Sequence, residues 1–468
     1  MAAAPALRLR LGLRSGHFLH NGCMPDLPRK AVTRTAKLAS LPLGYAGRSA
    51  LGVGKRLGGA PAEAVMNEVQ QRTAEQLFRT LGELKGGAMK FGQALSILEG
   101  ALPEEMAAPY RAHLTKLQDS APPMSTAVVH QQLVKEFGAG WKRRIVEFDD
   151  IPTAAASIGQ VHRGRWVDGT DIAVKIQYPG AEQAMMSDLR QIGRLAKTFG
   201  GLLPGIDARA LAQELQDRIV EELDYRLEAE AQELFAEAFV DDPRFVVPRP
   251  IAHSHRVLVT EWLPAVSSLA KVIEEGTTEE RNHWGTLYAR FVFEGPARTG
   301  MMHADPHPGN FRVVPGEGGA PDRLGVLDYG AVSRLPDREL PRSLGRLMQI
   351  ALLDDYDVVI KHLRIEGFIK PNIRVRAEDL KAYLGPFVDP ARSETFRFSR
   401  DYMRDQLTRL QDPAHPETQL AFRLNLPPEY LLIHRTFVGA VGVLCQLEAE
   451  VPFRGILEEL MPGFTDPL

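Results

Sequence analysis

The sequence predicts an α+β fold of two lobes, in which helical segments precede and follow a small β-sheet. Residues 62–137 carry apolar side chains at helical spacing, and residues 145–178 form short β-rich runs separated by turn signals such as Asp168-Gly169. After Pro341 the pattern is mostly helical. With 468 residues, the chain is long enough for two or three packed units or for one large bilobal fold.

The composition excludes several classes of protein. Hydrophobic residues make up 44% and charged residues 25% of the chain, as in soluble globular proteins, and a net charge of −3 predicts no nucleic-acid partner. Two cysteines, Cys23 and Cys445, cannot form a disulfide framework or a Cys-rich zinc site, and they fit a reducing, cytoplasmic compartment. The most apolar stretch, Thr436 to Leu447, is too short to cross a bilayer, so we predict a buried C-terminal helix and no transmembrane segment.

These patterns divide the chain into four predicted segments. They are a poorly ordered or targeting-like tail at 1–61, a helical extension at 62–140, a smaller lobe with inserted helices at 141–265 and a helix-rich lobe at 266–468. The tail contains Arg8, Arg10 and Arg14 but no acidic residue before Asp26, as in transit peptides. The alternative is an untranslated stretch before an initiator at Met24.

The segment HADPHPGN, from position 303 to 310, carries the first candidate catalytic residues. Asp305 is followed five positions later by Asn310, which is the spacing of a phosphotransferase catalytic loop. There the aspartate orients or deprotonates the attacking hydroxyl, and the asparagine helps to hold Mg²⁺. Downstream, Asp328 ends an apolar run in LDYG and is a candidate ligand for the same ion. The alternative is a transition-metal hydrolase site made of His303, Asp305 and His307.

Two upstream features complete a candidate nucleotide site. Lys175 ends the run IAVK, and in kinases such a lysine neutralises the α- and β-phosphates, although an isolated one is more often a surface residue of an edge strand. Ala154, Ala155, Ala156 and Ser157 lie where a Gly-rich, phosphate-covering loop would lie. Alone, this alanine-rich stretch indicates an ordinary tight turn or a helix start.

Together these motifs resemble the UbiB or AarF type of atypical kinase, kinase-like proteins linked to isoprenoid quinone biosynthesis. AAASIGQVHRG matches the alanine-rich loop of that family, Lys90-Phe91-Gly92-Gln93 its K-x-G-Q signature, and Glu222-Leu223-Asp224 its E-x-D motif. The resemblance covers roughly residues 62–335. It implies a bilobal protein-kinase-like fold with an N-terminal helical extension of the KxGQ type.

The resemblance also implies a role for each candidate residue. Lys175 would contact the nucleotide phosphates and pair with Glu228, on the same predicted helix as Glu222, and Asn310 and Asp328 would bind Mg²⁺. Lys90 and Gln93 would lie over the active site near Glu222 and Asp224. The expected catalytic residues are Asp305, Lys175 and Lys90, and the expected nucleotide-binding residues are Ala154, Ala155, Ala156, Ser157, Lys175, Glu228 and, near the interlobe hinge, Glu261.

The function implied is Mg²⁺-dependent ATP hydrolysis or phosphoryl transfer that supports isoprenoid quinone or lipid metabolism. Ala304 replaces the arginine that receives an activation-loop phosphate in ordinary kinases, and no A-P-E segment follows Asp328, so we do not expect a signalling protein kinase. Two alternatives are a small-molecule phosphotransferase of the aminoglycoside-kinase type, which the alanine-rich loop and KFGQ disfavour, and a non-catalytic nucleotide-switched binding module. The sequence leaves open a lipid or quinone-intermediate ligand and peripheral membrane contact.

Overall fold

The computed structural model describes residues 123–156, 158–183, 186, 220–411, 420 and 424–467, all within the compact unit Glu75–Leu468. Lys90, Gln93 and Ser157 lie outside the described residues, as do the tail and most of the predicted helical extension. The roles of these three side chains and the four segment boundaries stay predictions.

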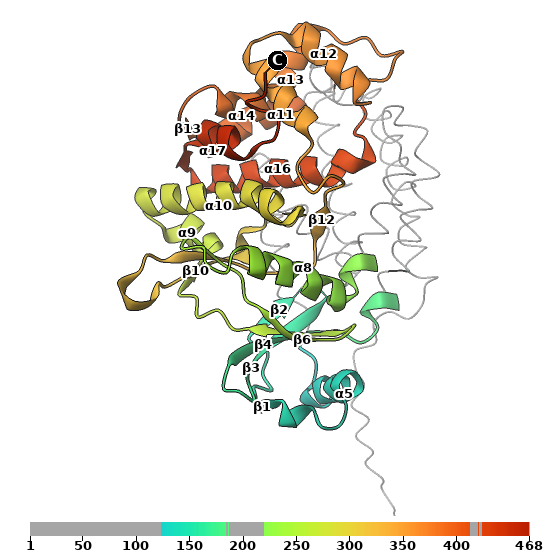
Figure 1. The fold of residues 1–468 in the computed structure, drawn as a ribbon, viewed down its shortest axis with the longest axis vertical. Coiled ribbons are helices and arrows are strands. Elements are labelled where there is room, and N and C mark those ends of the chain that lie inside the picture. The colour runs from blue at the N-terminus through green and yellow to red at the C-terminus, as the bar shows by residue number, and fades with distance from the viewer. Residues whose placement is uncertain are drawn as a thin grey trace, which may run out of the picture. The chain divides into compact units, whose positions relative to one another are not determined.

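The smaller lobe is built on an antiparallel sheet of six strands (Figure 1). The strands lie in the order β1-β3-β4-β7-β6, and β2 pairs with β3. Their bounds are β1 Ile145–Phe148, β2 Ala154–Ala156, β3 Gly159–Trp166, β4 Asp171–Gln177, β6 Pro250–His253 and β7 Val257–Glu261. The predicted β-rich runs are therefore confirmed as neighbouring strands of one sheet.

One face of this sheet packs on helix α5 (Thr126–Phe137) and the short turn η1 (Trp141–Arg143). Ile172, Val174 and Ile176 of β4 are fully buried in that core. Because side chains alternate across a strand, Lys175 lies on the opposite face. That opposite face is where helix α8 (Tyr225–Ala238) packs, beside β6 and β7.

Helix α8 begins at Asp224, whose side chain accepts a hydrogen bond from the backbone N–H of Arg226. Asp224 has an extended backbone (φ −111°, ψ 97°), as is usual for a helix N-cap. The helix therefore starts after Glu222, and the prediction that Glu222 and Glu228 share one helix was wrong. An aspartate at a helix start accepts hydrogen bonds from the first free backbone N–H groups. A new helix therefore begins at Asp224, although the spacing of apolar residues continues across this position.

The larger lobe combines a second small sheet with helices (Figure 1). Its sheet has the order β5-β11-β10-β8, with β5 and β11 parallel, and two short pairs, β9 with β12 and β13 with β14, lie apart from it. The strand bounds are β5 Phe245–Val246, β8 Ser267–Ser268, β9 Met301–His303, β10 Phe311–Val314, β11 Arg323–Val326, β12 Val332–Arg334, β13 Phe396–Arg397 and β14 Glu450–Val451. The helices are α9 Leu269–Glu275, α10 Thr278–Thr299, α11 Arg342–Leu352, α12 Tyr356–Ile365, α13 Ala377–Val388, α14 Arg400–Gln411, α16 Pro428–Leu447 and α17 Phe453–Leu460, with short 3₁₀ turns η3 Pro308–Asn310, η4 Glu317–Gly319 and η5 Asp389–Ala391.

Helix α10 organises this lobe. A reciprocal pair of hydrogen bonds between Thr277 and Glu280 caps its start, and Gly300 ends it in the left-handed conformation at φ 71°. The strand β9 follows at once and leads into the HADPHPGN segment. The capping pair therefore fixes where α10 begins, and Gly300 fixes where it ends and where the chain turns toward the candidate catalytic loop.

Helix α16 is longer than the sequence pattern predicted. The stretch Glu429–Leu447 contains 19 residues with a mean hydropathy of 1.4, so by length and composition alone it could cross a membrane. Its start at Pro428 fits a proline in the first helical turn. However, 61% of this stretch is buried inside the protein, where it packs in the core of the larger lobe. Length and apolar composition alone do not distinguish a buried core helix from a membrane span, and the burial of α16 fits the predicted core helix.

Candidate functional site

Lys175 brings two carboxylates together. Its Nζ lies 2.7 Å from Oε1 and 3.0 Å from Oε2 of Glu228, and 3.2 Å from Oδ1 of Asp328. The three side chains come from β4, from the first turn of α8 and from the turn after β11. Residues 53 and 153 positions apart in the chain therefore converge on one amine.

Burial governs the electrostatics of this cluster. Only 13% of the Lys175 side chain and 4% of the Glu228 side chain are exposed. Burial alone would lower the pKa of Lys175, but the Asp328 and Glu228 carboxylates outweigh it and hold that pKa well above its usual value. Burial raises the pKa of Glu228 to about 7, against the opposing effect of Lys175.

The Tyr225 ring packs against the ammonium group of Lys175, and the sequence analysis did not identify this residue. The Lys175 ammonium lies 5.1 Å from the centre of the Tyr225 ring, within range of a cation–π contact. The side chain is buried, and its hydroxyl has no hydrogen-bond partner in the described part of the chain. The available signal was an aromatic residue directly after the E-x-D motif, at the start of the helix that carries Glu228.

Asp328 is held in a strained backbone conformation. Its φ is 62°, in the left-handed region that few non-glycine residues adopt. Gly330 lies close beside the carboxylates, because a Cβ there would be 3.2 Å from Oδ1 of Asp328, 3.3 Å from Oε2 of Glu228 and 3.7 Å from Cγ of Glu222. Glu222 of the E-x-D motif is thus next to the cluster, whereas the expected position of Lys90 and Gln93 beside it stays a prediction.

The candidate catalytic loop is fastened to the same turn. The backbone N–H of Leu327 donates to the Asn310 carbonyl at 2.9 Å, and the His303 ring nitrogen Nε2 lies 3.2 Å from the Leu327 carbonyl oxygen. Asn310 and Asp328 are therefore brought to adjacent backbone segments. Oxygen donors of this kind, one carboxylate and one amide, fit Mg²⁺, which binds few protein ligands and completes its shell with phosphates and water.

Asp305 is buried within that loop. Its side chain accepts a long hydrogen bond (3.4 Å) from the His307 backbone, and its carbonyl accepts one of 3.4 Å from the Asn310 amide. The Tyr288 hydroxyl on α10 donates to the Pro306 carbonyl at 2.9 Å. Helix α10 thus holds the candidate catalytic loop through this hydrogen bond.

The two histidines of the loop do not form a metal site with Asp305. Within the residues that the structure describes, no group of three or more His, Cys, Asp or Glu side chains could hold a metal ion. His307 accepts a hydrogen bond at Nδ1 from the Gly309 backbone, and burial lowers its pKa. His303 instead packs edge-on against Tyr329, with ring centres 5.1 Å apart. The metal-hydrolase alternative therefore finds no support.

The alanine-rich stretch forms a β-hairpin. Ala154, Val161 and Lys175 lie opposite one another on β2, β3 and β4, so the alanines lie two strands from the lysine. Gly159 comes so close to β4 that a Cβ would lie 2.3 Å from the Ile176 carbonyl oxygen, so only glycine fits there. The hairpin begins as a strand, not as the helix start that remained an alternative.

Two other predicted residues make local contacts. The Asp224 carboxylate binds the Arg226 guanidinium at 2.6 Å and lies 3.3 Å from the His255 ring, and the Arg226 hydrogen bonds lower its pKa to about 2. Glu261 ends β7, and its carboxylate accepts a hydrogen bond from the Arg249 backbone. The Glu261 side chain thus links the end of β7 to the residue before β6, and its expected part in nucleotide binding stays a prediction.

A two-lobed α+β fold, with a strand lysine paired to a helix carboxylate and to an aspartate after a buried strand, is that of a protein-kinase-like protein. The ABC1 atypical kinase-like domain matches residues 116–363, just over half of the chain. The chain therefore belongs to the ABC1 atypical kinase-like family, which confirms the resemblance and the kinase-like fold. It is an enzyme of the phosphotransferase class whose substrate the family does not specify.

Three relatives illustrate the match. The chain is 27% identical to the mitochondrial atypical kinase coq-8 of Caenorhabditis elegans, covering 98% of this chain and 60% of that protein. It is 28% identical to the mitochondrial atypical kinase COQ8B of Rattus norvegicus, covering 92% and 81%. Among solved structures, Rv3197 of Mycobacterium tuberculosis, in complex with erythromycin, matches with 40% identity and a TM-score of 0.65, covering 87% of this chain and all of that one.

Proposed function

We propose that this chain binds Mg-ATP at the Lys175 cluster and hydrolyses it or transfers its terminal phosphoryl group. The observation that carries the proposal is the convergence of Lys175 with Glu228 and Asp328. A lysine held by one carboxylate, with a second at the metal position, is the arrangement that kinase-like enzymes use on a triphosphate.

Each residue then has a defined task. Lys175 binds the α- and β-phosphates, and Glu228 holds its amine in place. Asn310 and Asp328 supply the oxygen ligands, and the Mg²⁺ that they hold neutralises phosphate charge. Asp305 orients the attacking water or hydroxyl and accepts its proton.

The proposed acceptor is water or a small molecule, not a protein side chain. Ala304 cannot bind an activation-loop phosphate, and its backbone N–H donates to the Ala331 carbonyl, which closes the loop onto the segment after Asp328. This contact holds the loop without a phosphate signal.

We further propose a hydrophobic substrate or activator, of the lipid or quinone-intermediate type. The support for this proposal is the resemblance to the quinone-linked kinase family. The apolar pocket in the larger lobe, lined by Phe293, Phe387 and Phe437 among others, has a volume of about 60 Å³, which is too small for such a ligand. Cytoplasmic location and peripheral membrane contact stay predictions; the relatives named coq-8 and COQ8B are mitochondrial.

Two variants test the nucleotide site. Asp328→Asn should lose the thermal stabilisation that Mg-ATP gives the wild type, because a bound ligand must raise stability. Asp305→Asn should keep that stabilisation but lose ATP hydrolysis. Unchanged stabilisation of the first variant, or full activity of the second, would remove these residues from their roles.

The acceptor is tested by ATP hydrolysis measured with and without anionic lipid vesicles, quinone-like phenols and erythromycin. The last compound is included because Rv3197 was solved with it. Stimulation by vesicles or phenols supports a hydrophobic substrate or activator. Phosphorylation of an aminoglycoside would favour the aminoglycoside-kinase alternative, and nucleotide binding without any turnover would favour the nucleotide-switched module.

A further inference from the structure

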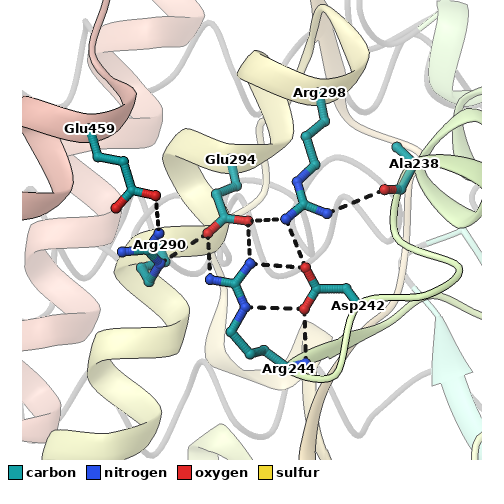
Figure 2. A network of polar contacts seen from close by, with 7 residues as sticks. All are labelled: Ala238, Asp242, Arg244, Arg290, Glu294, Arg298 and Glu459. Carbon is teal, nitrogen blue, oxygen red and sulfur yellow. Dashed lines mark hydrogen bonds and ion pairs between the residues drawn. The ribbon is translucent and has the colours of Figure 1, made fainter.

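A network of ion pairs around two buried carboxylates, Asp242 and Glu294, lies at the end of α8 remote from Glu228 (Figure 2). Its centre is the Glu294 carboxylate on α10, which is 4% exposed and is contacted by three guanidinium groups. Arg244 binds it through two nitrogens at 2.8 and 2.9 Å, Arg290 approaches at 2.9 Å and Arg298 at 2.6 Å. The proposed nucleotide chemistry uses none of these residues.

The network clamps the C-terminal end of α8. Arg298 donates to the carbonyl of Ala238, the last residue of the helix, at 3.3 Å and to the buried Asp242 carboxylate at 2.7 Å. Its guanidinium also lies 4.4 Å from the centre of the Phe239 ring. Figure 2 shows Arg298 between Glu294 on one side and Ala238 and Asp242 on the other. The Arg298 side chain of α10 therefore binds both the C-terminal end of α8 and the turn that follows α8.

The same network holds the strand that leads to Asp328. Arg244 is bound by Asp242 at 2.9 Å, and its own carbonyl accepts a hydrogen bond of 2.8 Å from the backbone N–H of Leu324 on β11. Strand β5 begins directly after Arg244 and pairs in parallel with β11, Leu324 lying opposite Phe245, and Asp328 follows the end of β11. Both carboxylates that bind Lys175 are thus connected to one set of ion pairs.

We propose that Arg298, with Glu294 and Asp242, is a positioning residue that holds α8 where Glu228 meets Lys175. The inference rests on the proposed nucleotide function and adds how that site is kept assembled. Glu228 and Ala238 are ten positions apart, about 15 Å along the helix axis, so a tilt at the clamped end displaces Glu228. The site is preformed by this clamp, without a signal from an activation loop.

A double-mutant cycle tests the clamp. Arg298→Met removes the charge and the hydrogen bonds, and Arg298→Lys keeps the charge. Arg364→Met is the control, because Arg364 also bonds two backbone carbonyls, at 3.1 and 2.6 Å, but lies on α12 of the larger lobe. The affinity for Mg-ATP is measured for each variant in the wild-type and the Glu228→Gln backgrounds.

Arg298→Met should weaken Mg-ATP binding about tenfold in the wild-type background and hardly at all in the Glu228→Gln background. Arg298→Lys should recover part of the affinity, and Arg364→Met should leave it unchanged. Equal losses in both backgrounds would show that Arg298 does not act through Glu228 and would overturn the proposal, as would no loss at all.

A second measurement needs no nucleotide. Acylation of Lys175 by an amine-reactive reagent, followed by mass spectrometry, reports whether Glu228 still covers the amine. Its rate should rise several-fold in Arg298→Met and stay constant in Arg364→Met; an unchanged rate in Arg298→Met overturns the clamp. If the wild type does not bind Mg-ATP, the proposed function fails, while the acylation rates still decide whether the clamp exists.

Discussion

Replacing Lys175 by methionine is the most direct perturbation of the site, because it removes the ammonium group that contacts the buried Glu228 carboxylate and the partly exposed Asp328 carboxylate. Methionine has a similar length and no charge, so little packing is lost. The amine lies 2.7 Å from Glu228 and 3.2 Å from Asp328. At an effective dielectric constant of about 20, these separations correspond to about 6 and about 5 kcal/mol of attraction.

The dehydration of the charges offsets part of that attraction. Removing one partner of a buried ion pair typically costs about 3–5 kcal/mol, and the low exposure of Lys175 and Glu228 places this pair in that class. We therefore expect Lys175→Met to lose about 3–5 kcal/mol of unfolding free energy at pH 8, measured by urea titration.

The double variant Lys175→Met/Glu228→Gln separates charge from packing. It removes the carboxylate that the single variant leaves unpaired, so it should recover at least half of the lost stability. A single variant as stable as the wild type at pH 8, or a double variant no more stable than the single one, would refute the electrostatic reasoning.

Three further predictions concern the same cluster. Because the pKa of Glu228 is raised to about 7 in the folded protein, its stabilising contribution is complete below its unfolded pKa of about 4.5 and is lost as the pH rises through 7. The stability of Glu228→Gln relative to wild type should therefore improve over that interval, and a pH-independent difference would contradict the shift. Gly330→Ala should weaken Mg-ATP binding, because the new methyl group lies 3.2 Å from Asp328 and 3.3 Å from Glu228; isothermal titration with unchanged affinity would count against this crowding. Tyr225→Phe should keep Mg-ATP affinity and stability, whereas Tyr225→Leu should lose about 1–2 kcal/mol of stability with the ring face under Lys175; equal effects in thermal unfolding would exclude the cation–π contact.

Local patterns predicted much of the smaller lobe correctly. The predicted β-rich run that contains IAVK is a strand in the structure. Because side chains alternate along a strand, Lys175 lies on the face opposite the buried Ile172 and Val174. The same patterns were misleading about where helices begin, because a capping side chain or tertiary packing decides that position. Asp224 starts a new helix within a continuous helical pattern. Helix α16 extends eight residues before Thr436, and in this added part Tyr430, Leu432 and Ile433 are buried in the larger lobe.

The sequence by itself determined which residues are expected to serve phosphate chemistry, because the short spacing from Asp305 to Asn310 and the chain order of Lys175 and Asp328 can be read along the chain. Only the tertiary structure decided that Tyr225 lies under the lysine and that Arg298 clamps α8. The physical reason is that these contacts join residues tens of positions apart, and their geometry depends on how α8, α10 and the two sheets pack, which no local period encodes.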